Sequence, residues 1–329
     1  MKILITGVAG LLGSHFSRYL LDNGYEVVGI DNLSGGYKEF IDERVIFYNE
    51  DLINHKKVDE IFEQEKPQIV YHFSAYASEG LSPFIRRFNY INNIICSMNI
   101  INPCINHNVD KMVFTSSMAV YGSGIPPFIE SGGLKPEDPY GIAKMAVETD
   151  LKLAYKLLNL RYGIIRPHNV VGIYQNIWDR YRNVIGIWIN NTLNKKPILI
   201  YGDGEQKRAF SDIKYSVEPF LKIGMIDKDE SIYNIGSDKE YTLNETADIF
   251  SNVAKEHGYD VNINHVETRD EVKLAYSDHT RAKTELDFND ETDLRSVISD
   301  MFVWSMTQPE REVKDMEYEV DKNIYSYWK

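Results

Sequence analysis

The chain has 329 residues, 43% of them hydrophobic and 26% charged, and its formal net charge is −13. These proportions are ordinary for a globular protein, and the length favours two lobes over one small core. The acidic balance argues against a protein built to hold nucleic acid or an anionic membrane, although it leaves room for a local basic pocket that binds a diphosphate.

The chain offers little for metal or disulfide chemistry. Its two cysteines, Cys96 and Cys104, lie in a stretch of helical character without metal-ligand spacing, which indicates buried thiols. The sequence MKILITGVAG starts directly on a strand pattern without a signal peptide, and no apolar run reaches about 18 residues. We therefore expect a cytoplasmic protein that spans no membrane and holds no metal.

The first 165 residues alternate short apolar runs with amphipathic stretches. Strands are expected at Lys2–Thr6, Glu26–Ile30, Val45–Tyr48, Gln68–Phe73, Lys111–Thr115 and Tyr162–Arg166, and helices at Leu11–Asn23, His55–Glu65, Phe88–Asn106 and Pro139–Asn159. Asn23-Gly24 is typical of a left-handed helix end, and Asp138-Pro139 of a capped helix start. This alternation predicts an α/β fold of the Rossmann type, a doubly wound parallel sheet covered on both faces.

After Arg166 the rhythm loosens, which predicts a smaller C-terminal α/β substrate lobe. Short strands are expected at Pro197–Tyr201, Ser231–Ile235 and Asn262–Val266, with a helix at Leu243–His257. We place the lobes at residues 1–170 and 171–329 and leave open an exchange of strands between them. The charged tail after Gln308 carries Tyr318, Tyr325, Tyr327 and Trp328, so we expect a docked helix there.

A glycine-rich turn follows the first expected strand. Gly7-Val8-Ala9-Gly10-Leu11-Leu12-Gly13 has the spacing G-x-x-G-x-x-G, and glycines there let the backbone approach a pyrophosphate at a helix N-terminus. The turn could serve the fold alone. However, Asp31 ends the second strand, where a carboxylate accepts hydrogen bonds from an adenosine ribose. Asn32 comes next, rather than an arginine that could hold a 2′-phosphate, which favours NAD over NADP.

Tyr140 and Lys144 are four residues apart in an expected helix, so they lie on one helix face. A tyrosine with a pKa of about 10 is a poor base at neutral pH, but a nearby ammonium group stabilises its phenolate. This spacing also arises by chance in a chain with 22 tyrosines. Ser117 favours the catalytic interpretation, because it follows an apolar strand at the edge where parallel strands form a ligand crevice.

Together these motifs resemble the extended short-chain dehydrogenase/reductase family. The resemblance is carried by Gly7 to Gly13, Asp31, Val113-Phe114-Thr115-Ser116-Ser117-Met118-Ala119-Val120-Tyr121-Gly122, Tyr140 to Lys144, and Arg166-Pro167-His168-Asn169-Val170-Val171-Gly172. Within that family the chain looks like UDP-glucose 4-epimerases and related nucleotide-sugar epimerases. The resemblance implies NAD as the cofactor and a nucleotide-sugar, expected to be a UDP-sugar, as the substrate.

The resemblance also implies roles for individual residues. Tyr140 is expected to be the catalytic base, Lys144 the partner that lowers its pKa, and Ser117 a second hydroxyl on the reacting oxygen. The residues expected to bind NAD are Gly7, Gly10, Leu11, Leu12, Gly13, Asp31, Asn32, Asp51, Leu52, Phe73, Ser74, Ala75, Asn93, Thr115, Tyr140, Lys144 and Pro167. Diphosphate-binding positions are matched by Asn169, Arg208 and Arg269, although surface ion pairs are the alternative for the two arginines.

Some positions near the expected sugar depart from the common epimerase pattern. Glu79 and Arg86 lie in an altered loop, and Arg86 is a candidate for a substrate carboxylate, as a glucuronate epimerase requires; a solvated helix start is the alternative. Ala275 stands where relatives use bulk to exclude N-acetylated sugars, so an enlarged sugar is permitted. The sugar is therefore open among glucose, glucuronate and N-acetylhexosamine.

The residues after Ser117 favour epimerisation among the family's reactions. Family dehydratases and decarboxylases carry acidic residues in the two positions before Val-Tyr-Gly, where this chain has Met118 and Ala119. We therefore expect transient oxidation at C4 of the sugar and return of hydride to its opposite face. A dehydratase or net oxidoreductase is the alternative, if a carboxylate such as Glu79 or Glu130 reaches the site. Intact catalytic positions disfavour a non-catalytic NAD-binding protein.

The helices expected at 88–106 and 139–159 match the pair that relatives use for dimerisation. A homodimer is therefore expected by analogy.

Overall fold

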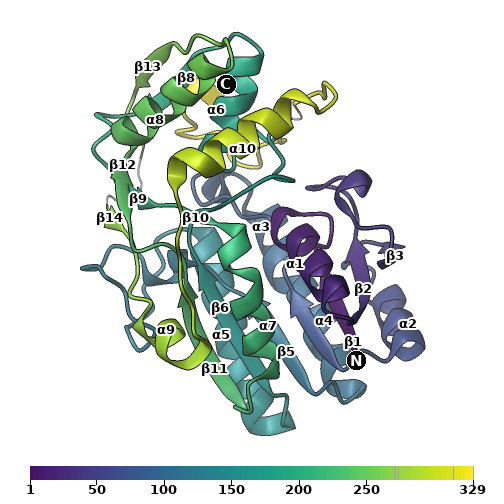
Figure 1. Ribbon diagram of the computed structural model, residues 1–329. Helices are drawn as coiled ribbons and strands as arrows, with labels where there is room; N and C mark the ends of the chain where they lie inside the picture. Colours follow the sequence, from purple (N-terminus) through teal and green to yellow (C-terminus); the bar gives the residue numbers. More distant parts are fainter. Residues whose placement is uncertain (270–271, 273, 314, 329) are drawn as a thin grey trace.

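The computed structural model describes residues 1–269, 272, 274–313 and 315–328. A seven-stranded parallel sheet forms its centre, in the order β11-β6-β5-β4-β1-β2-β3 (Figure 1). The strands are β1 Lys2–Thr6, β2 Glu26–Asp31, β3 Ile46–Asn49, β4 Ile69–His72, β5 Lys111–Thr115, β6 Tyr162–Pro167 and β11 Glu230–Ile235. The expected Rossmann-type α/β sheet is confirmed, and the predicted strand ends differ from the observed ones by at most one residue.

Helices cover both faces of this sheet, as continuous apolar strands require. On one face lie α1 Leu11–Asp22, α7 Val217–Met225 and α9 Thr280–Leu286, packed through Phe16, Phe220 and Leu286. On the other face lie α2 His55–Glu65, α4 Cys96–Asn106 and α5 Pro139–Leu158, packed through Val58, Ile100 and Leu151. The sheet is thus buried between two apolar layers, and its carboxyl edge is left for a ligand.

The helix expected at Phe88–Asn106 is divided into three parts. It runs as α3 Arg86–Tyr90, a π-helical turn Ile91–Ile95 and α4 Cys96–Asn106. Cys96 and Cys104 are both buried, as expected, and burial raises the pKa of each thiol. Helix α5 begins at Pro139, where the Asp138 side chain accepts hydrogen bonds from the amides of Tyr140 and Gly141. The predicted cap of this helix is confirmed.

The smaller lobe has its own core of three helices and short strands. The helices are α6 Val184–Leu193, α8 Leu243–Glu256 and α10 Leu294–Met306, and the strands are β8 Ile198–Tyr201, β9 Lys207–Ala209, β12 Glu240–Thr242, β13 Ile263–Val266 and β14 Leu274–Ala275. Trp188, Phe250 and Phe302 pack at its centre. Helices α6 and α10 were not expected from the sequence, because their apolar residues do not follow a clear helical stripe.

The two lobes are joined by a short strand pair and by elements from the second half of the chain that pack in the large lobe. Strand β7 Val170–Val171 pairs with β10 Ser211–Asp212, and α7 and β11 return from beyond residue 170 to the large sheet. Short 3-10 turns occupy Lys38–Phe40, Ser82–Phe84, Met118–Tyr121, Ile213–Tyr215 and Ser326–Trp328. The chain therefore crosses between the lobes more than once, and the boundary at residue 170 stays a prediction.

The C-terminal tail docks without forming the expected α-helix. Among its described residues, the segment after Gln308 contains a single short 3-10 turn, Ser326–Trp328, and Ile324 and Trp328 are buried. Its aromatic residues lack a helical period, so each packs separately. Among the described helices, none combines the length and the apolar character needed to cross a membrane.

Candidate active site

A cavity of about 830 Å³ opens at the carboxyl edge of the sheet, between the two lobes. It collects expected residues from far apart in the sequence: Gly7, Gly10, Leu11, Leu12, Gly13, Phe73, Ala75, Glu79, Thr115, Ser117, Tyr140, Lys144, Pro167, Asn169, Arg208 and Arg269. The cavity thus brings the expected cofactor turn, the Tyr–Lys pair and two candidate phosphate arginines to one place.

The glycine turn between β1 and α1 is too tightly packed for side chains. Gly7 has a φ of +72°, and a Cβ on it would lie 2.8 Å from the amide nitrogen of Ser74. A Cβ on Gly13 would lie 2.2 Å from the carbonyl oxygen of Gly7. These contacts require glycine, and they leave backbone amides at the N-terminus of α1 on the cavity wall, where a pyrophosphate is favoured.

Asp31 is placed at the end of β2, beside that turn. Its carboxylate accepts hydrogen bonds from the amides of Ala9 (3.0 Å) and Leu33 (2.7 Å), while burial raises its pKa. These bonds hold the carboxylate in one orientation, and each oxygen retains lone pairs for a ribose hydroxyl.

Asn32 and Asp51 form a linked pair near the same edge. The Asn32 amide donates to the Asp51 carboxylate (2.9 Å), and the Asn99 side chain donates to the carbonyl oxygen of Leu52 (2.8 Å). Neither Asp31 nor this pair lines the large cavity, so their contacts with the cofactor stay predictions. Leu52 is buried and belongs to the sheet core.

Tyr140, Ser117 and Lys144 meet on the cavity wall. Ser117 lies close enough to the Tyr140 side chain to lower its pKa, and both residues line the cavity. The Lys144 ammonium donates to the carbonyl oxygen of Thr115 (2.8 Å) and lies 5.7 Å from the centroid of the Tyr140 ring. The helical spacing therefore places phenol and ammonium as expected, and β5 supplies the serine.

The pKa values of Tyr140 and Lys144 are set mainly by burial, whereas the sequence led us to expect that Lys144 would lower the pKa of Tyr140. Burial raises the pKa of Tyr140 above its ordinary value, the charge of Glu79 raises it further, and the Ser117 hydrogen bond lowers it. Burial also lowers the pKa of Lys144 to about 7, with Glu148 acting in the opposite direction. Burial and the charge of Glu79 thus outweigh Ser117 and the charge of Arg182, so the pKa of Tyr140 is raised on balance.

A buried ion pair between Glu148 and Arg166 packs against α5, the helix that carries Tyr140 and Lys144. Glu148 receives hydrogen bonds from Arg166 (2.9 and 2.6 Å) and from the Ser116 hydroxyl, and both charged side chains are almost fully buried. Glu148 is one turn after Lys144, and Arg166 is at the end of β6. Neither Glu148 nor Arg166 was among the residues expected at the site, although Arg166 directly precedes the Pro167-His168-Asn169 motif.

Asn93 and Ser74 do not line the cavity, but both form hydrogen bonds that hold the 73–77 loop beside it. The Asn93 side chain lies in the π-helical turn and donates to the carbonyl oxygen of Tyr76 (3.2 Å), next to Ala75. The Ser74 amide donates to the Thr6 hydroxyl (3.2 Å). Both residues position the 73–77 loop, and π-helical turns of this kind occur often at functional sites.

On the other side of the cavity, Asn169 and Arg208 come together through β9. Asn169 has a φ of +40° and donates through its side chain to the carbonyl oxygen of Ala209 (3.0 Å). Arg208 lies opposite Ala275 in the pairing of β9 with β14. Arg269 stacks on the ring of Tyr201, 4.6 Å from its centroid, and also lines the cavity. The two candidate phosphate arginines therefore face the same space.

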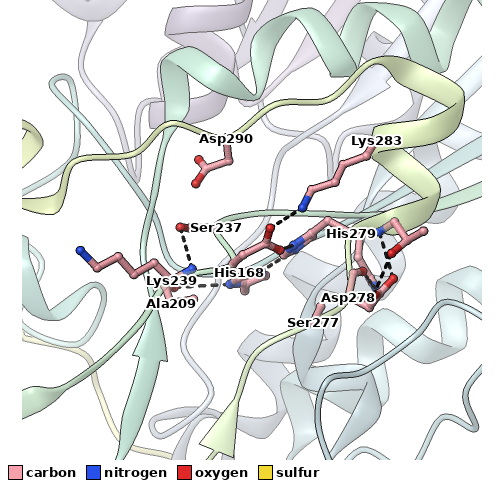
Figure 2. A network of polar contacts seen from close by, with 12 residues as sticks. His168, Ala209, Ser237, Lys239, Ser277, Asp278, His279, Lys283 and Asp290 are labelled. Carbon is pink, nitrogen blue, oxygen red and sulfur yellow. Dashed lines mark hydrogen bonds and ion pairs between the residues drawn. The ribbon is translucent and has the colours of Figure 1, made fainter.

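A buried pair of histidines, His168 and His279, links the segment after β6 to the segment before α9 (Figure 2). His168 Nε2 lies 3.0 Å from His279 Nε2, and His279 Nδ1 donates to Asp238 (2.7 Å), which also pairs with Lys283. Burial lowers the pKa of His168 to about 3, and the Nδ1 of this neutral ring donates to the carbonyl oxygen of Ala209 (3.4 Å), which leaves its Nε2 as the acceptor towards His279. The network joins the loop before β7 to the start of α9.

A smaller hollow of about 110 Å³ branches from the cavity beside Ala275. It shares Glu79, Ser117 and Asn169 with the large cavity, and Met118 and Ala119 also line it. Glu130 is held away, since its carboxylate accepts from the amide of Asn234 (2.9 Å). Of the two carboxylates considered from the sequence, Glu79 is therefore the one at the site.

Arg86 is not brought to this site. It is exposed in the first turn of α3 and lines neither space, so its contact with a substrate carboxylate stays a prediction that this arrangement does not support. Arg180 and Arg182 of the 175–183 loop line the cavity instead, and Arg182 pairs with Asp179 (2.8 Å). The polar and aromatic composition of this loop was a sequence signal for a binding segment. The loop has no regular secondary structure, however, so the sequence did not show that it lies at the cavity.

The fold and the site define an NAD-type dinucleotide-binding enzyme with a tyrosine–lysine pair. Comparison with known proteins is consistent with this class. The chain matches the NAD dependent epimerase/dehydratase family over residues 3–236, and it belongs to that family.

Relatives cover nearly the whole chain. A Methanocaldococcus jannaschii protein, provisionally named a UDP-glucose 4-epimerase, is 32% identical over 92% of this chain and 97% of its own length. The Thermotoga maritima UDP-glucose 4-epimerase structure with UDP-glucose has a TM-score of 0.86 at 29% identity, covering 93% and 99% of the two chains. A Methanobrevibacter ruminantium UDP-N-acetylglucosamine 4-epimerase, in complex with UDP-N-acetylmuramic acid, has a TM-score of 0.85 at 29% identity, covering 94% and 99%.

Proposed function

We propose that this protein is an NAD-dependent nucleotide-sugar epimerase that inverts C4 of a UDP-sugar. The observation that carries the proposal is the convergence of Tyr140, Ser117 and Lys144 on the cavity that also contains the glycine turn. Its support includes UDP-sugar 4-epimerase relatives that match the chain along nearly its whole length.

The residues present fit NAD. The Gly7–Gly13 turn has no room for a Cβ, so its amides are open to a pyrophosphate, and the oriented Asp31 carboxylate suits an adenosine ribose. Phe73, Ala75, Thr115 and Pro167 would line the nicotinamide end. When bound, NAD supplies a reversible hydride acceptor and a positive charge beside Tyr140.

Each catalytic side chain has a separate task in the proposal. Tyr140 takes the proton from the C4 hydroxyl and later returns it, while Ser117 donates a hydrogen bond to the same oxygen. Lys144 adds positive charge that favours the phenolate. With NAD as the acceptor, the C4 carbon would lose its hydride and become a ketone. The 4-keto sugar would then turn about its phosphate linkage, while Asn169, Arg208 and Arg269 hold the diphosphate, and the same hydride would return to the opposite face of C4. The net reaction is an inversion without a change in redox state.

An enlarged sugar fits the space beside Ala275. The side hollow next to Ser117 is formed partly by this small side chain, and a substituent on a sugar whose C4 faces Tyr140 could enter it. The Methanobrevibacter ruminantium relative is a UDP-N-acetylglucosamine 4-epimerase. We therefore place UDP-N-acetylhexosamines beside UDP-glucose as substrates, and Ala275→Tyr is expected to reduce turnover of the N-acetylated sugar selectively.

The direct test is a panel of UDP-, GDP- and dTDP-sugars, which includes UDP-glucose, UDP-glucuronate and UDP-N-acetylglucosamine, with products identified by NMR. The purified protein should contain tightly bound NAD and form a C4 epimer without added reductant. A protein free of nicotinamide, or one that forms no epimer from any sugar in the panel, would contradict the proposal.

A 4,6-dehydratase is the second candidate, because Glu79 supplies a carboxylate at the site. Its charge acts on Tyr140, and it lines both the cavity and the side hollow. A dehydratase would release a 4-keto-6-deoxy sugar, which the same NMR experiment distinguishes from an epimer. Glu79→Gln would abolish dehydration but leave epimerisation measurable.

A homodimer is also part of the proposal. Large apolar side chains are exposed on α5 and on the neighbouring π-helical turn: Ile91, Ile95, Ile142, Leu153, Leu157 and Leu158. A second copy is the natural cover for such a face. Light scattering should give twice the mass of one chain, and Leu157→Glu should shift the mass to that of the monomer. A monomeric unmodified protein would contradict the proposed dimer.

A further inference from the structure

The contact between His168 and His279 is not used by the proposed reaction, yet the fold makes room for it (Figure 2). The two rings are nearly parallel, with centroids 5.1 Å apart, and both side chains are almost fully buried. A Cβ on Gly236 would lie 2.2 Å from His168 Nε2, so the backbone there leaves space for the imidazole. Because buried polar groups are costly unless they are hydrogen-bonded, the partners of this pair indicate what it does.

The outer contacts of the two rings fix the positions of their protons. His168 Nδ1 donates to the carbonyl oxygen of Ala209 (3.4 Å), and His279 Nδ1 donates to the Asp238 carboxylate (2.7 Å). Both acceptors lack a proton of their own, so each Nδ1 carries one. If both rings were neutral, the two Nε2 atoms would face each other with lone pairs at 3.0 Å. One further proton is therefore required between them, and the adjacent carboxylate favours it on His279.

The charged groups around His279 match a cationic ring. One oxygen of Asp238 accepts from His279, and the other pairs with Lys283 of α9. Hydrogen bonds from His279 and Lys283 hold the pKa of Asp238 well below its ordinary value, against the effect of burial. Asp278 and Asp290, which Figure 2 also labels, bond to nearby threonine hydroxyls instead. Asp238 is thus the carboxylate that balances the ring.

On its other side, His168 is joined to two residues expected at the diphosphate. The carbonyl oxygen of Ala209 accepts from His168 Nδ1 and also from the side chain of Asn169 (3.0 Å). Ala209 directly follows Arg208, so one peptide oxygen ties the position of Asn169 to that of Arg208. Asn169 has a φ of +40°, a conformation that persists only when the surrounding structure supports it. His168, Asn169 and Arg208 also line the side hollow together.

We infer that His168 and His279 are positioning residues for the diphosphate of the nucleotide-sugar, and that His279 acts as a buried imidazolium. This inference rests on the proposed function. The proton on His279 Nε2 keeps His168 Nδ1 as the donor to Ala209, and that contact fixes Asn169 relative to Arg208. Loss of the proton at higher pH would move the remaining proton of His168 from Nδ1 to Nε2. The bond to Ala209 would then be lost, and the diphosphate site would loosen.

The test uses the full-length protein and measures the dissociation constants of UDP, GDP and dTDP by calorimetry, which requires no turnover. His279→Leu removes the donor to His168, so the dissociation constant of the preferred nucleotide should rise about tenfold, as expected for one charge-assisted hydrogen bond. Where epimerisation is measurable, KM should rise with it while kcat stays close to that of the unmodified protein.

His279→Gln is the conservative variant, because its side-chain amide can still donate to His168 but carries no charge and does not titrate. Its nucleotide affinity should be close to that of the unmodified protein. Relative to this variant, the unmodified protein should lose affinity as the pH rises. NMR of the imidazole nitrogens, with the His279 signals assigned by their loss in the variants, should show both nitrogens of His279 protonated.

His257→Leu is the matched control. His257 is a partly buried histidine that stacks on Phe302 in the small lobe and lines neither the cavity nor the side hollow. The same substitution there should leave nucleotide affinity unchanged. Unchanged affinity in a folded His279→Leu variant would overturn the inference, even if the protein is an epimerase. An unprotonated Nε2 on His279 in the unmodified protein would overturn it as well.

The outcomes separate this inference from the proposed reaction. A protein whose nucleotide affinity depends on His279 but that forms no epimer would refute the reaction and keep the inference. An unmodified chain that binds none of the three nucleotides would exclude positioning of a diphosphate. Bound NAD, measured by absorbance after denaturation, should be equal in all variants, because the histidine pair lies outside the glycine turn.

Discussion

The two ends of the cavity are built in different ways. The cofactor end is made largely by one continuous unit, β1, the Gly7–Gly13 turn and α1, with Asp31 at the end of the adjacent strand. The opposite end, where we propose that the nucleotide-sugar binds, is lined by Asn169, Tyr201, Arg208, Arg269 and Tyr327, which are far apart in the sequence. A local unit keeps its geometry by backbone packing, whereas the assembled end depends on contacts between segments.

The two ends are therefore sensitive to different substitutions. A single added methyl group damages the cofactor end, because backbone atoms stand where a Cβ would be. The sugar end relies on side chains such as Arg180 and His168, which tie separate segments together and can be replaced one at a time. Four changes test this contrast, from the largest expected effect to the smallest.

Tyr140→Phe tests the point where the two ends meet. The change removes one hydroxyl, so kcat should fall by about 10²- to 10⁴-fold, while bound NAD and thermal stability remain close to those of the unmodified protein. Tyr155→Phe is the matched control on the same helix, where the hydroxyl bonds to Asp229 (3.0 Å) on the surface. Turnover that survives Tyr140→Phe would remove this residue as the base.

Gly13→Ala tests the cofactor end. The new Cβ would lie 2.2 Å from the carbonyl oxygen of Gly7 and 2.6 Å from Val8 Cα, so the free energy of unfolding should fall by about 3 kcal/mol and NAD should be lost. Gly133→Ala is the control, because a Cβ there meets nothing within 4 Å. Chemical denaturation and NAD content are the measurements, and equal behaviour of the two variants would contradict the tight-turn account.

Lys144 predicts a pH dependence of stability. The unfolded chain keeps this proton up to about its ordinary pKa of 10.5, whereas burial lowers the pKa to about 7 in the folded protein. The unfolded state thus binds more protons between these values, so stability rises with pH there, by roughly 2 kcal/mol from pH 7 to 9. In Lys144→Met this contribution should disappear from the denaturation curves. The same slope in both proteins would exclude a neutralised lysine.

Arg208→Ala tests the assembled end. Loss of a charged hydrogen-bond donor to the diphosphate should raise KM for the nucleotide-sugar about tenfold and leave bound NAD unchanged. Arg161→Ala is the control, since Arg161 pairs with Asp227 (2.9 Å) and Asp229 (2.8 Å) and is outside the cavity lining. An unchanged KM would return Arg208 to the role of a surface ion-pair partner.

Most of the large lobe could be predicted from the sequence. Strand β5 and helix α2 were predicted to the residue, because a short apolar run and an amphipathic period are local signals. The cap at Asp138 and the positions of Tyr140 and Lys144 followed from local rules as well. Prediction was weaker for α10 and for the C-terminal segment after Gln308, which has aromatic contacts but no α-helix among its described residues.

The order of the motifs, the spacing of the Tyr–Lys pair and the glycines of the turn could be read from the sequence alone, because these features depend on neighbours within a few residues. Only the tertiary structure decided that Glu79 and Arg182 reach the cavity while Arg86 does not, and that Tyr327 meets Tyr201. It also showed that burial opposes the ionisation of Tyr140 and Lys144. Side-chain direction and desolvation are set by residues distant in the chain, so no local pattern contains them.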